Sequence, residues 1–135
     1  MKEQILLFRF EDEDRLSAVR KAMLPLHIAC RVVPEEKWSC PLGVLAGLEP
    51  SAALPEMESA ALTAEVLVLC GLSDAGIQSV VAALRKAGVY IPYKAALTPT
   101  NRDWTAGQLF GELVREHEMM QQMLRERRAA EQRNP

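Results

Sequence analysis

Apolar positions along the chain form two patterns, short continuous runs and runs spaced three or four residues apart, which predict strands alternating with helices. Residues 5–10 (ILLFRF) and 66–70 (VLVLC) are apolar runs of strand length. The second run holds no polar residue, so we expect both of its faces to be buried. Residues 28–33 and 89–97 predict two further strands, and Pro92 places the last one at a sheet edge or a bulge.

Four helices are expected between and after these strands. Helical spacing of apolar residues predicts helices over residues 12–24, which have an acidic first turn, and over residues 74–87, which Ser73 can cap. A short helix over residues 41–48 and a long one over residues 104–130 follow the second and fourth strands. The order strand, helix, strand, helix therefore occurs twice.

This order predicts an internal duplication. Residues 5–10 overlie residues 66–71 at an offset of 61, and Trp38 overlies Trp104 at an offset of 66. Both tryptophans follow a proline and stand at or near the start of a helix. We expect one domain over residues 1–124, made of pseudo-repeat halves 1–49 and 64–118 and a linker over 50–63, with a polar tail over 125–135.

The predicted fold class is α+β. Duplicated strand–helix–strand–helix units form one four-stranded sheet packed with helices, with residues 5–10 and 66–70 in the middle. The ferredoxin-like arrangement, in which the halves meet antiparallel, is preferred. The alternative is a doubly wound α/β fold in which all strands run parallel. Two extra helices can cover the second face, so we expect the sheet to be buried on both sides.

Three segments of the second half, VLVLCGLSD (66–74), LRKAG (84–88) and KAALTPTNRDW (94–104), resemble an uncharacterised bacterial domain family of unknown function. The Leu-Thr-Pro-Thr-Asn-x-x-Trp segment is the most specific part. The resemblance covers roughly the last half of the chain, to about residue 119, and residues 33–38 of the first half lack the threonines and the asparagine. Because the family has no assigned activity, the resemblance implies fold and domain boundaries, and it places any site in the second half.

The best candidate for ligand chemistry is the loop of residues 98–104, which follows a strand and begins a helix. Free backbone N–H groups and the positive end of the helix dipole bind anions at such a position. The candidate ligand-binding residues are Lys94, Thr98, Thr100, Asn101, Arg102 and Trp104. The same residue types also fit simple helix capping, with the tryptophan packed in the core. The loop contains no glycine, so it is not a strict phosphate-binding motif.

Composition, charge and residue spacing argue against several classes of function. A net charge of −2 gives no electrostatic case for nucleic acid, and no apolar stretch reaches the length of a membrane span. Three widely spaced cysteines and two histidines offer no metal-ligand spacing, so we expect no metal, no cofactor and a reduced, cytoplasmic protein. The acidic residues 11–14 resemble the acid pair of phosphoacceptor domains, but Cys70 and Gly71 stand where those domains need an aspartate. A solvated helix start explains them.

We find no catalytic constellation, which leans against an enzyme. The first hypothesis is a non-enzymatic interaction or self-associating module, which uses the last helix to form a homodimer or to bind a protein partner. The apolar positions of the last helix continue through Leu113, Met120, Met123 and Leu124, and Glu116 and Arg127 break a heptad repeat. The alternative is a small-ligand or anion-binding domain that uses the loop of residues 98–104. A third, weaker hypothesis is an enzyme with an unrecognised site.

Overall fold

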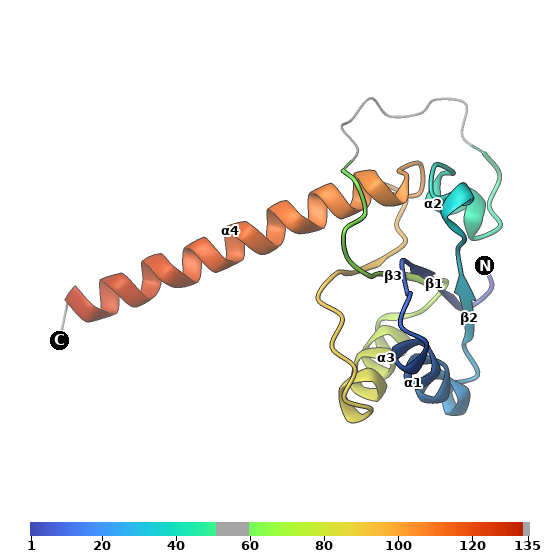
Figure 1. Cartoon of the computed structure of the whole chain (residues 1–135), viewed down its shortest axis with the longest axis horizontal. Helices are drawn as coiled ribbons and strands as arrows, with labels where there is room; N and C mark the ends of the chain where they lie inside the picture. Colours follow the sequence, from blue (N-terminus) through green and yellow to red (C-terminus); the bar gives the residue numbers. More distant parts are fainter. Residues whose placement is uncertain (51–59, 134–135) are drawn as a thin grey trace.

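The computed structural model describes residues 1–50 and 60–133, which form two strand–helix–strand units, each followed by a further helix (Figure 1). In chain order the elements are β1 (Gln4–Phe8), α1 (Glu13–Met23), the 3₁₀ helix η1 (Leu24–Leu26), β2 (Ala29–Val32), the 3₁₀ helix η2 (Glu35–Lys37), α2 (Leu42–Leu45), β3 (Val66–Cys70), α3 (Asp74–Lys86), β4 (Lys94–Ala96) and α4 (Ala106–Arg133). The fold is mixed α and β, as the sequence predicts.

The four strands form one sheet in the order β2-β1-β3-β4. The two apolar strands β1 and β3 pair antiparallel at its centre, with Leu6 opposite Val68, which confirms the predicted middle of the sheet. β2 runs parallel to β1, and β4 runs parallel to β3. Because the two halves meet antiparallel, the all-parallel alternative is wrong.

The edge strands show where the sheet differs from the ferredoxin-like arrangement. In a split βαβ unit another strand lies between the two parallel strands, whereas here each edge strand lies directly beside the strand of its own unit. Each crossover helix thus returns the chain to the edge next to the strand that it left. The two halves share their order of elements, and their common ancestry stays a prediction.

Both faces of the two central strands are buried, whereas the edge strand β2 is mostly exposed and the edge strand β4 is half-buried. Successive side chains of a strand point to opposite faces, and a layer of helices covers each face. On one face α1 and α3 lie side by side, and Val19 and Val80 are fully buried there with Ile5 and Leu7 (Figure 1). α2 and the first turns of α4 cover the other face. The buried residues of that second layer include Leu6, Phe8, Val66, Val68, Leu42, Leu45, Leu109 and Phe110. The expectation of a sheet covered on both sides is therefore confirmed for the two central strands.

Three strands are shorter than the sequence pattern predicts, and β2 loses one residue at each end of the predicted range 28–33. β1 ends at Phe8 rather than at residue 10, because Arg9 adopts a left-handed backbone with φ of 60°. β4 spans only Lys94–Ala96 instead of residues 89–97. Val89 and Ile91 are buried in the core without joining the sheet. Their apolar side chains therefore serve core packing and not strand pairing. Pro92, which lacks an N–H group, lies between them and β4.

The last helix differs at both ends from the prediction over residues 104–130. α4 begins at Ala106 and continues to Arg133, through most of the predicted polar tail. The predicted linker over residues 50–63 lies mainly outside the described residues, although Leu62 is buried against the core. Within the described ranges, no helix combines the length and the apolar character that a membrane crossing needs.

Candidate functional site

The loop of residues 98–104 is held together by the side chain of Asn101, which is buried. Its amide oxygen Oδ1 accepts a hydrogen bond of 2.8 Å from the Thr98 N–H, and its Nδ2 donates to the Ala96 carbonyl at 2.9 Å. The Thr98 hydroxyl in turn accepts from the Asn101 N–H at 3.1 Å. These three bonds account for the asparagine and the first threonine as turn residues.

The two cations predicted beside this loop also bind backbone groups of their own chain. Arg102 donates from Nη2 to the Glu49 carbonyl at 2.7 Å and lies 3.7 Å from the Asp103 carboxylate. Lys94 donates from Nζ to the Ile91 carbonyl. Partial burial lowers the pKa of the Lys94 ammonium group, because burial disfavours its charged form. Neither charge is held ready for an external anion in this arrangement.

Thr105 and Gln108 cap the N-terminus of α4. The Thr105 N–H donates to Gln108 Oε1 at 2.8 Å, and the Gln108 N–H donates to Thr105 Oγ1 at 3.3 Å. This reciprocal pair is a capping box, which satisfies N–H groups that an anion would otherwise bind. The cap explains why the helix begins after Trp104 rather than at it.

The loop also joins the two halves of the molecule. The N–H groups of Leu42 and Gly43, at the start of α2, donate to the carbonyls of Trp104 and Arg102 at 2.8 and 2.7 Å. A Cβ atom at Gly43 would lie 3.0 Å from the Arg102 carbonyl oxygen, so the close approach depends on glycine. Thr100 is the remaining candidate residue, and it is exposed. The site residues are therefore brought together, with most of their polar groups engaged internally.

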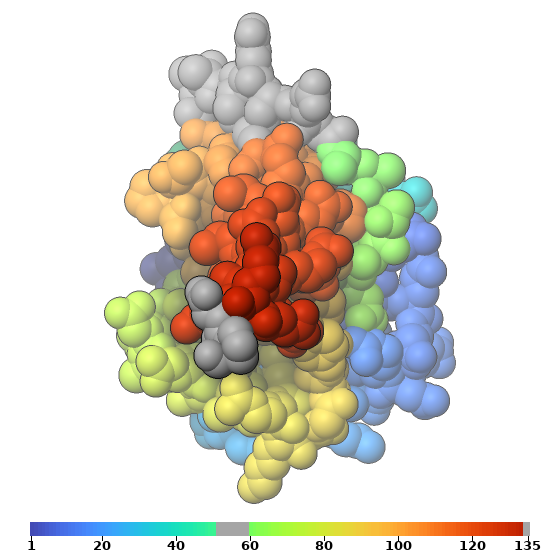
Figure 2. Space-filling view, turned by 90° about the vertical axis from the view of Figure 1, so that its left-hand side faces the viewer, coloured from blue at the N-terminus to red at the C-terminus, as the bar shows by residue number. Residues whose placement is uncertain are grey.

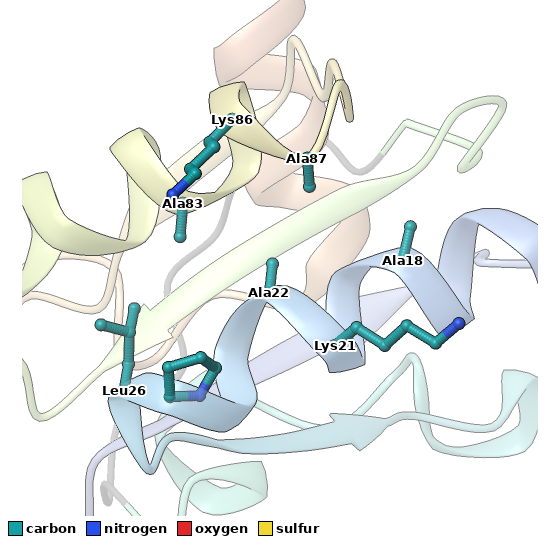
Figure 3. A pocket seen from close by; sticks show the side chains of 8 residues that line it. Ala18, Lys21, Ala22, Leu26, Ala83, Lys86 and Ala87 are labelled. Carbon is teal, nitrogen blue, oxygen red and sulfur yellow. The ribbon is translucent and has the colours of Figure 1, made fainter.

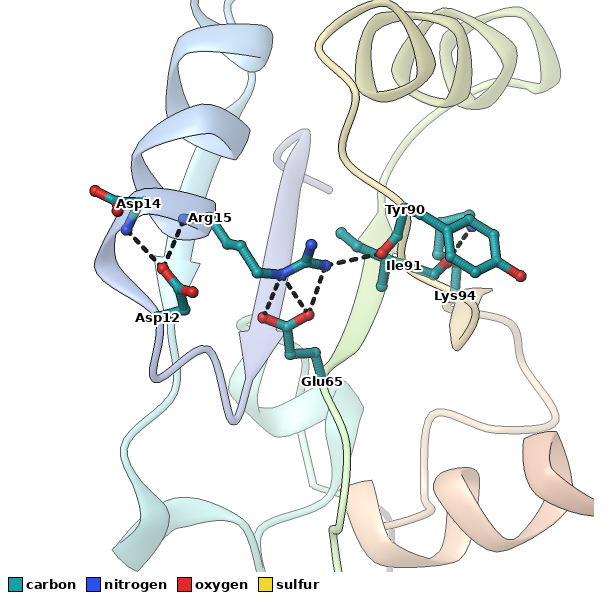
Figure 4. Close-up of polar contacts among 7 residues, drawn as sticks. All are labelled: Asp12, Asp14, Arg15, Glu65, Tyr90, Ile91 and Lys94. Carbon is teal, nitrogen blue, oxygen red and sulfur yellow. Dashed lines mark hydrogen bonds and ion pairs between the residues drawn. The ribbon is translucent and has the colours of Figure 1, made fainter.

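A second polar cluster, which the sequence pattern did not single out, links α1 to the second half of the chain. The Arg15 guanidinium donates from Nη2 to Glu65 Oε1 at 2.7 Å and to the Tyr90 carbonyl at 2.8 Å (Figure 4). The hydrogen bonds with Glu65 raise the pKa of Arg15. Asp12, in the predicted acidic run, caps α1 by accepting from the N–H groups of Asp14 and Arg15. These contacts hold α1 against the second half of the chain.

An open groove of about 540 Å³ lies between α1 and α3 (Figure 3). Its lining residues are Ala18, Lys21, Ala22, Pro25, Leu26, Ala83, Lys86 and Ala87. Small alanine side chains form its floor, and Figure 3 shows the two lysines, one from each helix. Among the described residues, no group of three or more His, Cys, Asp and Glu side chains could hold a metal ion.

The last feature is the distal part of α4, residues 118–133, which extends away from the body (Figure 1). Tyr93 marks the end of its packing, with ring centroids 5.2 Å from Phe110 and 5.8 Å from His117. Figure 2 looks along the helix toward the body, with its last turns nearest the viewer. Beyond this point four apolar side chains are open to solvent, with exposed fractions of 64% for Met119, 58% for Met120, 62% for Met123 and 46% for Leu124.

No curated protein and no solved structure matches the chain. A family model matches its second half. Residues 65–120 match a family model described as "Domain of unknown function (DUF3783)", which spans β3, α3, β4 and the packed part of α4. The match confirms the resemblance that the sequence indicates. Residues 65–120, less than half of the chain, are thus similar to this family, and the distal part of α4 lies almost wholly outside the match.

Proposed function

We propose that this chain is a non-enzymatic interaction module, that the distal part of α4 is its contact surface, and that the partner is another amphipathic helix. One observation carries the proposal. α4 leaves the body after His117 and presents Met119, Met120, Met123 and Leu124 to solvent within six consecutive residues. Single exposed apolar residues need no explanation, whereas a contiguous group is typical of a contact surface.

The helical form of this surface favours a helical partner. A lone helix of about 15 residues is marginal in water, because its stability comes mainly from packing an apolar face. A second helix that lays its apolar side chains between these residues supplies that packing. Methionine suits such a contact, since its unbranched thioether side chain adapts to an irregular surface.

The geometry of the loop of residues 98–104 supports this function over the anion-binding alternative. The Asn101 amide and the Arg102 guanidinium bind backbone carbonyls of their own chain, and the capping box satisfies the start of α4. An anion would have to displace these bonds. The distal part of α4 has no comparable internal partners for its apolar side chains.

The test measures protection of the apolar face of α4 in cells that make the chain. A single cysteine is placed on that face by Met120→Cys, or on the opposite face by Arg125→Cys, in a background with Cys30→Ser and Cys40→Ser. Cys70 is kept, because burial raises the pKa of its thiol to about 12 and leaves it unreactive. The rate of maleimide labelling is measured in intact cells and in dilute purified protein.

We expect the Met120→Cys variant to react several-fold more slowly in cells than as dilute protein, because a partner helix covers that face. The Arg125→Cys variant, five residues further along and about 140° around the helix, serves as the matched control. Its rate should be the same under both conditions. Equal behaviour of the two variants would contradict a contact role for the distal part of α4.

A further inference from the structure

We propose that the helix covering this surface is α4 of a second copy of the chain, packed antiparallel. The inference rests on the contact role proposed above for residues 118–133, and it names the partner. Charge is unevenly distributed along α4, and the body lies at one end of that helix. Together these two features select both the partner and its direction.

Charge along α4 is divided into three consecutive segments. Residues 112–118 carry three glutamates and one arginine, a net charge of −2, with His117 neutral. Residues 119–124 carry no charge, and this neutral segment holds all four exposed apolar side chains. Residues 125–133 carry four arginines and two glutamates, a net charge of +2. Two such helices attract one another antiparallel and repel one another parallel.

Glu116 and Arg127 make this preference specific. They are the two residues that break the heptad, and they carry opposite charges. Eleven residues separate them, which is about three helical turns, so both project from the same side of α4, in line with the apolar stripe and just beyond its two ends. Two antiparallel helices centred between Gln121 and Gln122 place Glu116 of each copy opposite Arg127 of the other.

The same register pairs the exposed apolar residues with each other. Met120 lies opposite Met123 of the second copy, and Met119 lies level with Leu124. A parallel pair would instead set Glu116 against Glu116 and Arg127 against Arg127, with like charges opposite one another. Within the described part of the chain, Glu116 has no ion pair, while Arg127 has one exposed contact of 3.8 Å with Glu131. Both charges are therefore available to a second copy.

The position of the body favours the same direction. In each copy the sheet and its helices lie at the N-terminal end of α4 (Figure 1). Antiparallel packing keeps the two bodies at opposite ends of the helix pair. A parallel pair would bring both bodies to the same end, where their surfaces would have to fit as well.

The experiment is a charge-swap series on the full chain. Dimer dissociation constants are measured by sedimentation velocity over a concentration series for the wild type, Glu116→Arg, Arg127→Glu and the double variant that carries both. Each single swap turns two attractive contacts per dimer into repulsive ones, so we expect roughly tenfold weaker association. The double variant restores opposite charges across an antiparallel pair, so we expect its dissociation constant to return to within about threefold of the wild-type value.

Glu118→Arg is the matched control, since it makes the same charge change about 200° around the helix from residue 116. Its dissociation constant should stay within about threefold of the wild type. A dimer that both single swaps leave unchanged, or that the double variant fails to restore, overturns the antiparallel arrangement. A chain that stays monomeric while the Met120→Cys variant is protected in cells overturns the second copy as partner and leaves the proposed function standing. A chain that stays monomeric and whose Met120→Cys variant is not protected in cells overturns both the second copy as partner and the proposed function.

Discussion

The loop of residues 98–104 and the distal part of α4 differ in where their chemistry is used. The loop carries threonine, asparagine and arginine side chains, the types that bind anions, and its geometry turns most of them toward their own backbone. The helix carries methionines, a leucine and charges that suggest no reaction, and they point to solvent. Polar residues beside a helix start indicate a ligand site only when their partners are missing.

This difference between the loop and the helix follows from the free-energy cost of burying polar groups. A buried amide without a hydrogen bond costs free energy, so a turn that buries Asn101 must also satisfy it. Within the described residues, every buried side-chain nitrogen or oxygen has a hydrogen-bond partner. An exposed methionine carries no such requirement, and a second chain can cover it at a net gain. The incomplete part of the molecule is therefore an apolar surface rather than a polar pocket.

The largest expected effect comes from removing the internal partner in the loop. Asn101→Ala removes a buried amide and leaves the part-buried Thr98 N–H and Ala96 carbonyl without their bonds. We expect the free energy of unfolding to fall by about 2 kcal/mol, measured by urea denaturation. Thr100→Ala, at an exposed position of the same loop, is the control and should change it by less than about 0.5 kcal/mol. Similar small losses for both variants would mean that Asn101 is not a structural residue.

An intermediate effect is expected at the Arg15 cluster, which is also satisfied internally. Arg15→Met keeps much of the side-chain volume and removes the bonds to Glu65 and the Tyr90 carbonyl. Because both charged side chains retain some contact with solvent, we expect a loss of about 1 kcal/mol. The loss should shrink in the Glu65→Gln background, as a double-mutant cycle would show. Full additivity of the two substitutions would argue against the pair.

The sequence predicts the centre of the fold well, because the relevant signals are local. The all-apolar residues 66–70 must be covered on both faces, and the spacing of Val80 and Leu84 defines a buried helical stripe. Strand order could not be predicted in the same way. Whether an edge strand pairs with the first strand of its own half or of the other half depends on how the crossover helix packs. No residue in β2 or β4 indicates which strand it pairs with.

The candidate site shows the same limit more sharply. The pattern Thr-Pro-Thr-Asn indicates a turn before a helix, and the structure has one, but the pattern does not reveal which groups the asparagine binds. The ion pair of Arg15 and Glu65 spans 50 positions, so no local pattern contains it. The exposure of Met119 and Met120 likewise depends on where the body ends. The sequence feature that indicates this exposure is the length of α4, whose 28 residues extend beyond the sheet that it covers.

A smaller effect on stability is expected on the α4 side of the comparison. Leu124→Lys replaces an exposed side chain, so the free energy of unfolding at low protein concentration should change by less than about 0.5 kcal/mol. At high concentration the same variant should lose any rise of the melting temperature with concentration, because a lysine in the neutral segment disrupts helix packing. A loss above about 1.5 kcal/mol in dilute protein would mean that Leu124 packs on its own body.

The smallest effect is expected from anions at the loop. Phosphate binding would stabilise the folded chain by an amount that grows with the logarithm of phosphate concentration, about 2.7 kcal/mol at one hundred times the dissociation constant, and would raise the melting temperature accordingly. Because the capping box and the carbonyl partners of Lys94 and Arg102 already use the relevant donors, we expect no change in melting temperature between 0 and about 20 mM phosphate beyond that of a chloride control at equal ionic strength. A rise that exceeds the chloride control and that Arg102→Gln removes would contradict this expectation. Such a rise would show that an anion displaces the Glu49 carbonyl, and the loop would then be the open region of the molecule.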